Sequence, residues 1–207
     1  MTKIPLHYQV SEYDCGPTCV LNAMSYLFCR EELSPELIRN IMLYCLDCYG
    51  TDGSCGKRGT SYMAMMFLSN WLNGYGEVGH LPVSSSFLSG EKVNFNKNGE
   101  LYDALRRNGA AVVRLDLEGW HYVLLTGIEE DRVYLFDPYY KKDAFDQKEI
   151  IMVEDQPERY NRIIPIRYLE KEELTLYSMG PIETREAVIL FNKETKLTQE
   201  KTVEYVI

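Results

Sequence analysis

The stretch that decides the fold runs from Gln9 to Cys19 and reads QVSEYDCGPTC, with the residues VLNAM directly after it. Gly16 and Pro17 suit the corner between a loop and a helix, because proline is tolerated in the first turn of a helix and disrupts later turns. The spacing of the apolar residues that follow predicts a helix from Cys15 to about Phe28. We expect this helix to be the central one of the fold.

Cys15 would open this helix, where a thiol is well placed to become a nucleophile. The unpaired N–H groups and the dipole of a helix N-terminus favour the thiolate, which is the reactive form of cysteine. Six residues upstream, Gln9 offers an amide donor for the negative charge that develops when a thiolate attacks a carbonyl. The stretch therefore predicts both an attacking group and an oxyanion stabiliser. The alternative is that Cys15 is a small, buried and unreactive core residue.

The predicted base is His121, one of three histidines in the chain. It lies in GWHYVLLTGI, residues 119–128, where β-branched, aromatic and apolar residues predict a buried strand. After a turn at 129–131, a second predicted strand, 132–136, ends at Asp137. A hairpin would place the Asp137 carboxylate on one ring nitrogen of His121 while the other nitrogen faces Cys15. A structural, hydrogen-bonded core histidine is the alternative.

Five short motifs, in this order, carry a resemblance to a known family: Gln9, Asp14-Cys15-Gly16, Cys19, His121-Tyr122-Val123 and Asp137-Pro138. They resemble the papain-like peptidase domain of bacteriocin-exporting transporters, which removes double-glycine leader peptides. The resemblance covers residues 5 to 153 and implies a papain-like fold, with Cys15 as nucleophile, His121 as base, Asp137 as its orienting partner and Gln9 in the oxyanion hole. We do not carry over cleavage after a double glycine, because the chain shows no membrane-spanning segment or nucleotide-binding domain of a transporter.

The order of predicted elements, helices first and strands later, is typical of an α+β protein with a mostly antiparallel sheet and helices on one side. Further helices are predicted from Ser34-Pro35, over 61–72 and over 100–107, and further strands over 110–115, 150–153, 163–169 and 187–191. Residues 73–98 are predicted to be an insertion of loops with one short strand. We therefore expect a papain-like domain over 1–155 and a C-terminal extension over 156–207 that adds strands to the same domain.

The remaining cysteines do not predict a metal site. Cys45, Cys48 and Cys55, even with His80, lack the spacing of common zinc sites, so we expect free thiols, no metal and no cofactor. The glycine-rich loop 50–60 lacks the residue order of a phosphate-binding loop. We expect this loop to be a flexible lid near the cleft.

Composition limits the partners. The net charge of −9 argues against sequence-independent binding to nucleic acid or to anionic membranes, and it is compatible with a basic peptide or a cationic substrate. The sequence contains neither an apolar run long enough to span a membrane nor a secretory signal, so we expect a cytoplasmic protein without membrane insertion. The oligomeric state stays open.

These observations predict a cysteine peptidase or amidohydrolase that cleaves a peptide or amide bond through Cys15, His121 and Asp137 and a thioester intermediate. Gly119 and Trp120, which precede His121, are the predicted substrate-binding residues; simple packing is the alternative role for Trp120. Two other functions stay open. The same thioester could serve an acyltransferase, and the same fold could serve as a non-catalytic module that binds peptides.

Overall fold

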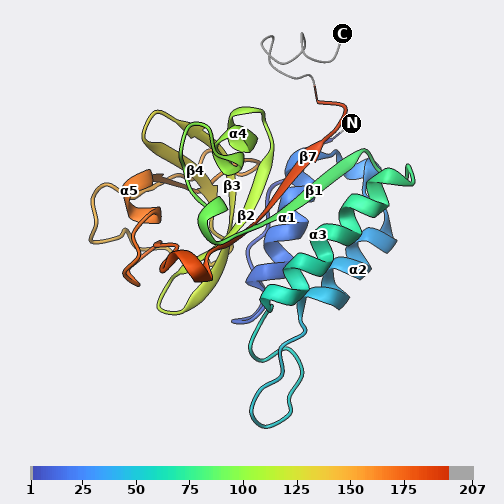
Figure 1. The fold of residues 1–207 in the computed structure, drawn as a ribbon, viewed down its shortest axis with the longest axis horizontal. Coiled ribbons are helices and arrows are strands. Elements are labelled where there is room, and N and C mark those ends of the chain that lie inside the picture. Colours follow the sequence, from blue (N-terminus) through green and yellow to red (C-terminus); the bar gives the residue numbers. More distant parts are fainter. Residues whose placement is uncertain (1, 196–207) are drawn as a thin grey trace.

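The computed structural model describes residues 2–195, and its centre is a seven-stranded sheet with the order β1-β7-β2-β3-β4-β6-β5 (Figure 1). All neighbouring strands in it are antiparallel. The strands are β1 (Val83–Ser89), β2 (Ala110–Asp116), β3 (Trp120–Glu129), β4 (Arg132–Phe136), β5 (Ile151–Met152), β6 (Arg162–Pro165) and β7 (Glu186–Asn192). The predicted α+β class is confirmed.

Helices cover both faces of this sheet. They are α1 (Cys15–Leu27), α2 (Pro35–Cys45), α3 (Tyr62–Glu77), α4 (Glu100–Arg106) and α5 (Ile166–Leu169), with 3-10 turns at Arg30–Glu32, Gly90–Lys92 and Ile182–Thr184. Figure 1 shows α1, α2 and α3 grouped on one side and α4 and α5 on the other. The prediction of helices on one side only was therefore wrong for the two short helices, which cover a second apolar core.

The two cores follow from the alternation of side chains along the central strands. Val112 and Leu124 belong to the core shared with α1, α2 and α3, whereas Val113 and Leu125 belong to the core shared with α4. The sheet is therefore buried on both faces, which explains why β2 and β3 read as nearly continuous apolar runs. α1 packs against β2 and β3, as expected of a central helix.

Three segments differ from the sequence prediction. α3 continues to Glu77, and residues 83–89 form a full strand although they contain a run of serines, because β1 pairs with β7 along its whole length. The predicted strand 163–169 ends at Pro165, which has no N–H to continue the ladder, and 166–169 is helical. Of the predicted C-terminal extension, β6 and β7 lie in the main sheet, whereas residues 196–207 lie outside the described part.

The loop between α2 and α3 extends away from the body of the protein (Figure 1). The two ends of the loop are held together, because the Asp47 carboxylate accepts hydrogen bonds from the backbone N–H and the hydroxyl of Ser61. Cys45 is buried at the end of α2, whereas Cys48 and Cys55 lie in the loop, and the cysteines are free thiols. Across residues 2–195, no three His, Cys, Asp or Glu side chains lie together as a metal site would require. None of the helices in the same residues has the length and the apolar character needed to span a bilayer.

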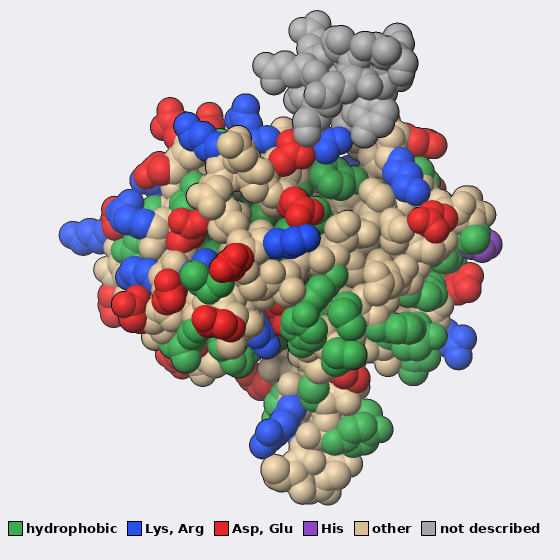
Figure 2. Space-filling view, viewed as in Figure 1, with side chains coloured by type: hydrophobic (Ala, Val, Ile, Leu, Met, Phe, Trp, Pro, Cys, Tyr) green, Lys and Arg blue, Asp and Glu red, His purple; other side chains and the backbone are tan. Residues whose placement is uncertain are grey.

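Figure 2 shows hydrophobic side chains gathered on the helical half of the molecule. Met63 and Phe67 of α3 are 60% and 49% exposed, whereas Met65 of the same helix is buried in the core. The methionine-rich helix is thus only partly a core helix.

Candidate active site

Cys15 is the first residue of α1 and lies where the N–H groups of that helix have no intrahelical partner. The residue before it fixes this position. The Asp14 carboxylate accepts hydrogen bonds from the backbone N–H groups of Val10 (3.0 Å) and Ser11 (2.6 Å) and from the Ser11 hydroxyl. Burial raises the pKa of Asp14, but these hydrogen bonds outweigh it and lower the pKa overall, so the carboxylate is charged and closes the turn that delivers Cys15.

Gly16 lets this corner pack against the loop before α3. A Cβ atom at Gly16 would lie 2.2 Å from Thr60 Oγ1 and 2.8 Å from Thr60 Cβ, which is closer than atoms can approach. Glycine is therefore required here because Thr60 leaves no room for a side chain, and not because of the backbone angle of the glycine itself.

We expect Gly16→Ala to destabilise the protein by about 1–3 kcal/mol, since the added methyl group forces the start of α1 away from Thr60. Chemical denaturation would measure the loss. Gly74→Ala is the matched control, because nothing lies within 4 Å of a Cβ at this helical position. That variant should be neutral or slightly stabilising, and equal losses in the two variants would contradict the steric explanation.

His121 and Asp137 are brought together by the β3–β4 hairpin. His121 is the second residue of β3, Asp137 directly follows β4, and the pair Leu124↔Phe136 sets the register next to them. The Nε2 atom of His121 lies 2.8 Å from Asp137 Oδ1, and the two residues are 7% and 1% exposed.

The His121 ring also interacts with Cys15. Burial lowers the pKa of His121, but hydrogen bonds with Asp137 and Cys15 and the charges of both groups outweigh it and raise the pKa to about 9. Because Nε2 contacts Asp137, Nδ1 is the ring nitrogen left for the thiol. The imidazole is therefore positively charged at neutral pH and lies between a carboxylate and a sulfur.

These residues line one cleft of about 860 Å³. All six residues predicted for the site contribute to its walls, namely Gln9, Cys15, Gly119, Trp120, His121 and Asp137. Within the described residues, neither loop 50–60 nor segment 73–98 lines the cleft, so the prediction of loop 50–60 as a lid near the cleft was wrong. Those segments instead support the start of α1 and form β1. The C-terminal residues Leu174, Thr175 and Leu176 contribute to the cleft in their place.

Gln9 lies in the cleft with a definite orientation. Its Nε2 group donates to the carbonyl of Ser11 at 2.7 Å, its backbone N–H donates to the carbonyl of Pro138 at 2.9 Å, and its Oε1 is buried without a partner. Since an amide nitrogen carries two protons, one N–H of the side chain is used locally and a second remains for a ligand.

Trp120 and Gly119 form the rim beside His121. The Arg114 guanidinium stacks over the Trp120 ring at 4.4 Å, and a Cβ atom at Gly180 would approach the same ring to 3.0 Å. The indole is nevertheless 45% exposed. Gly119 has a φ of 140°, which favours glycine at the turn into β3.

Three residues around Asp137 were missed by the sequence reasoning. The side chain of Asn161 accepts from the Asp137 N–H and donates to its carbonyl, both at 2.8 Å. The N–H of Tyr139 donates to Oδ1, and the hydroxyl of Tyr177 donates to Oδ2 at 2.6 Å. The proximity of Tyr139 to Asp137 in the chain was a usable signal, but nothing in the sequence connects Asn161 or Tyr177 with Asp137.

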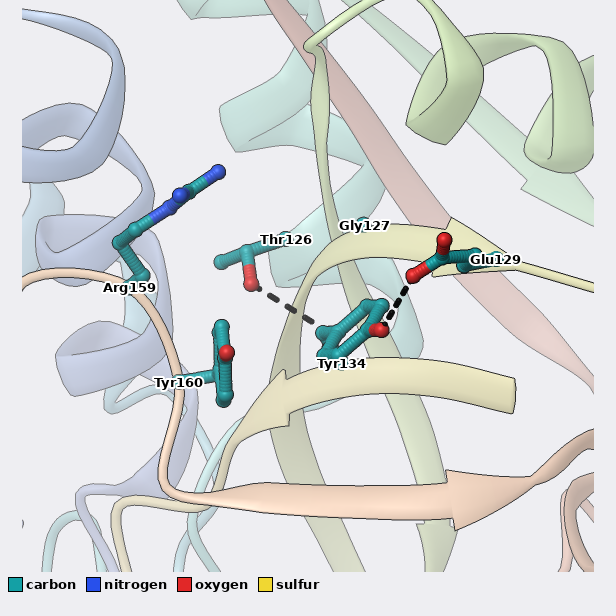
Figure 3. A pocket seen from close by; sticks show the side chains of 6 residues that line it. All are labelled: Thr126, Gly127, Glu129, Tyr134, Arg159 and Tyr160. Atoms are coloured by element: carbon teal, nitrogen blue, oxygen red, sulfur yellow. Dashed lines mark hydrogen bonds between the residues drawn. The ribbon is translucent and has the colours of Figure 1, made fainter. Parts of the chain in front are cut away.

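A second, smaller pocket of about 250 Å³ lies elsewhere on the sheet (Figure 3). Its walls are Thr126, Gly127, Glu129, Tyr134, Arg159 and Tyr160. Because it contains no cysteine or histidine, the larger cleft is the candidate active site.

A cysteine at a helix N-terminus, beside a histidine and a carboxylate on an antiparallel sheet, is the arrangement of residues that papain-like cysteine peptidases use. The chain belongs to the Peptidase_C39 like family, whose family model matches residues 1–164. Among solved structures, the chain is similar to a double glycine motif protease from an AMS/PCAT transporter in complex with the leader peptide. The two are 14% identical, the match covers 91% of this chain and 90% of the other, and the TM-score is 0.46. No curated protein matches the chain.

Proposed function

We propose that the protein is a cysteine peptidase that uses Cys15 as nucleophile, His121 as acid and base, and Asp137 as the partner that orients the ring. The observation that carries the proposal is the buried 2.8 Å contact between His121 and Asp137 in the cleft that also contains Cys15. The two partners of this ring are a carboxylate and a thiol, the pair that a base needs if it is to be oriented and to activate a nucleophile.

The chemistry follows from these positions. The thiolate of Cys15 attacks the peptide carbonyl, and the C–S bond forms as the carbonyl electrons move onto oxygen. The imidazolium of His121 then gives its proton to the departing amine as the C–N bond breaks, which leaves a thioester. Water, deprotonated by the now neutral His121, hydrolyses the thioester and restores the thiolate and the imidazolium.

The oxyanion formed in both steps needs N–H donors. The backbone N–H of Cys15 at the start of α1 and the free N–H of the Gln9 side chain are the donors that we assign to it. The local bond from Gln9 to Ser11 holds the amide in place before the substrate arrives. Such fixed donors stabilise charge without reorganisation during the reaction.

A peptide is the substrate class that we assign to this cleft. Carboxylates of Glu12, Asp116, Glu118 and Asp146 lie on its walls, and Lys141 is the cation that its described lining residues contain besides the His121 imidazolium. An acidic cleft attracts cationic segments. Trp120 and Gly119 would contact the chain next to the bond that is cut.

The test is mass spectrometry of a defined peptide library after incubation with the protein, with and without an added amine acceptor. We expect new peptide ends that carry water, enriched near Lys and Arg. Products that carry the amine in place of water would instead identify an acyltransferase. Binding of intact peptides without any product would identify a peptide-binding module.

Because the pKa of His121 is raised, we expect both kcat/KM and the stability of the fold to depend on pH. Deprotonation removes the acid that protonates the leaving amine, so we expect kcat/KM to fall above pH 9. The charged ring also stabilises the fold: its contribution is complete below the unfolded pKa of 6.5 and is lost as the pH rises through about 9. NMR titration of the three histidines would measure this directly. A His121 pKa near 6.5 would contradict both expectations.

A further inference from the structure

Resting on the roles proposed for His121 and Asp137, we propose that Tyr177 is a positioning residue of the candidate site: its hydroxyl fixes the Asp137 carboxylate so that Oδ1 faces His121. Tyr177 comes from the segment after β6 and lies beyond residues 1–164, the part matched by the family. The C-terminal part of the chain would then complete the site.

The two carboxylate oxygens of Asp137 have different partners. Oδ1 accepts from His121 Nε2 and from the N–H of Tyr139, both at 2.8 Å, while Oδ2 accepts from the Tyr177 hydroxyl at 2.6 Å. Asn161 holds the backbone of Asp137 but does not contact its carboxylate. Among the described residues, the Tyr177 hydroxyl is therefore the group that holds Oδ2 and prevents the carboxylate from rotating.

The segment that carries Tyr177 is tied to the end of β2 by backbone hydrogen bonds. The N–H of Tyr177 donates to the carbonyl of Asp116, and the N–H of Asp116 donates to the carbonyl of Ser178, both at 2.8 Å. Tyr177 has a φ of 62°, a conformation that costs a non-glycine residue energy and persists only where its surroundings impose it. The side chain is 0% exposed and its ring lies 5.6 Å from that of Phe145.

The surroundings of the Tyr177 hydroxyl keep it in its protonated form. Burial and the charge of Asp137 raise the pKa of the Tyr177 hydroxyl well above its ordinary value and outweigh the charge and hydrogen bond of Arg162, which lower it, so the hydroxyl stays protonated and donates at every pH at which the site would work. A hydrogen bond to a charged acceptor is among the stronger ones in proteins. Leu174, Thr175 and Leu176, just before Tyr177, also line the cleft, so one segment reaches both the substrate and the orienting carboxylate.

The test compares Tyr177→Phe with Tyr134→Phe in the full chain. Both variants keep the ring and remove a hydroxyl that donates to a carboxylate, but Tyr134 donates to Glu129 in the smaller pocket, as Figure 3 shows. We expect Tyr177→Phe to lower the His121 pKa, measured by NMR, by about one unit and to slow alkylation of Cys15 by iodoacetamide at pH 6 by about tenfold. Tyr134→Phe should change neither.

Both measurements report on the site without a peptide substrate, so they can succeed even if the protein does not cleave peptides. An unchanged His121 pKa in a folded Tyr177→Phe variant would overturn the proposal. A raised His121 pKa would also overturn it, because the hydroxyl would then only withdraw charge from the carboxylate without orienting it. In an Asp137→Asn background, Tyr177→Phe should have no further effect on alkylation; an additive effect would mean that Tyr177 acts by another route.

The unmodified protein provides a measurement that does not depend on the folding of a variant. With tyrosine labelled at its ring Cζ, the NMR signal of Tyr177 should titrate well above the ordinary value for tyrosine of about 10. Titration at the ordinary value would show that the hydroxyl is not held against the carboxylate in solution, which would overturn the proposal.

Discussion

Cys15→Ala abolishes peptide cleavage, with a loss of rate on the order of 10⁴-fold or more, if the thiol forms the covalent intermediate. The substitution removes a single sulfur atom from a residue that is 8% exposed at the start of α1. Because alanine is the better helix former and keeps the Cβ, the fold should be retained. The fragments that the wild-type protein produces from the peptide library should therefore disappear while thermal unfolding stays nearly unchanged.

Two other cysteines serve as controls for this result. Cys19, one turn later in α1, is fully buried and donates from its Sγ to the carbonyl of Tyr122, and Cys55 is exposed in the loop after α2. Cys55→Ala should cleave like the wild-type protein, and Cys19→Ala should cleave with at most a small loss of stability. Cleavage of the same bonds by Cys15→Ala at an undiminished rate would exclude thiol chemistry.

The positions of Cys15, His121 and Asp137 at the ends of a helix and of two strands could be predicted, because the sequence around each residue has a clear local pattern. Gly16 and Pro17 mark a loop-to-helix corner in any fold, and a hairpin joins neighbouring strands, so the ends of two strands close in sequence meet in space. The structure places all three residues in one cleft. What the sequence could not supply was the tertiary closure of that cleft.

Tyr177 and Asn161 show the limit of sequence reasoning. Tyr177 is 40 residues away from Asp137 in the sequence, and Asn161 is 24 residues away. Both look like ordinary polar residues in an irregular segment. The prediction of mostly loops over residues 73–98 missed the full length of β1 for a related reason. A serine-rich run has a weak intrinsic preference for strand, and residues 83–89 form a strand because β7, about a hundred residues later, pairs with them. Such contacts depend on the whole fold and leave no periodic pattern.

Gln9 is a case in which position was predictable and orientation was not. Its place upstream of Cys15 follows from the short turn closed by Asp14, but its amide is aimed by a hydrogen bond to Ser11 inside that turn. The sequence predicts a donor near the sulfur. The bond from its side-chain nitrogen to the Ser11 carbonyl is visible only in the structure.

Asp137→Asn is expected to lower kcat/KM by roughly 10²- to 10⁴-fold while leaving the fold intact. The amide has nearly the shape of the carboxylate and offers one acceptor oxygen, which can stay on His121 and Tyr139, while its NH₂ group turns to Tyr177. A tyrosine hydroxyl can rotate and accept where it previously donated, so the NH₂ group of the new asparagine keeps a partner. The backbone remains held by Asn161.

The loss of activity then comes from charge rather than from distortion. Without the carboxylate, only Cys15 still opposes the effect of burial on His121, so the pKa of His121 should fall from about 9 toward the ordinary value of 6.5, and the share of imidazolium at neutral pH should fall with it. Activity should partly return as the pH is lowered, which a distorted site would not show. Asp143→Asn, an exposed carboxylate outside the cleft, is the control and should leave the rate and the His121 titration unchanged. An Asp137→Asn variant with wild-type kcat/KM and a His121 pKa still near 9 would mean that Asp137 does not support the base.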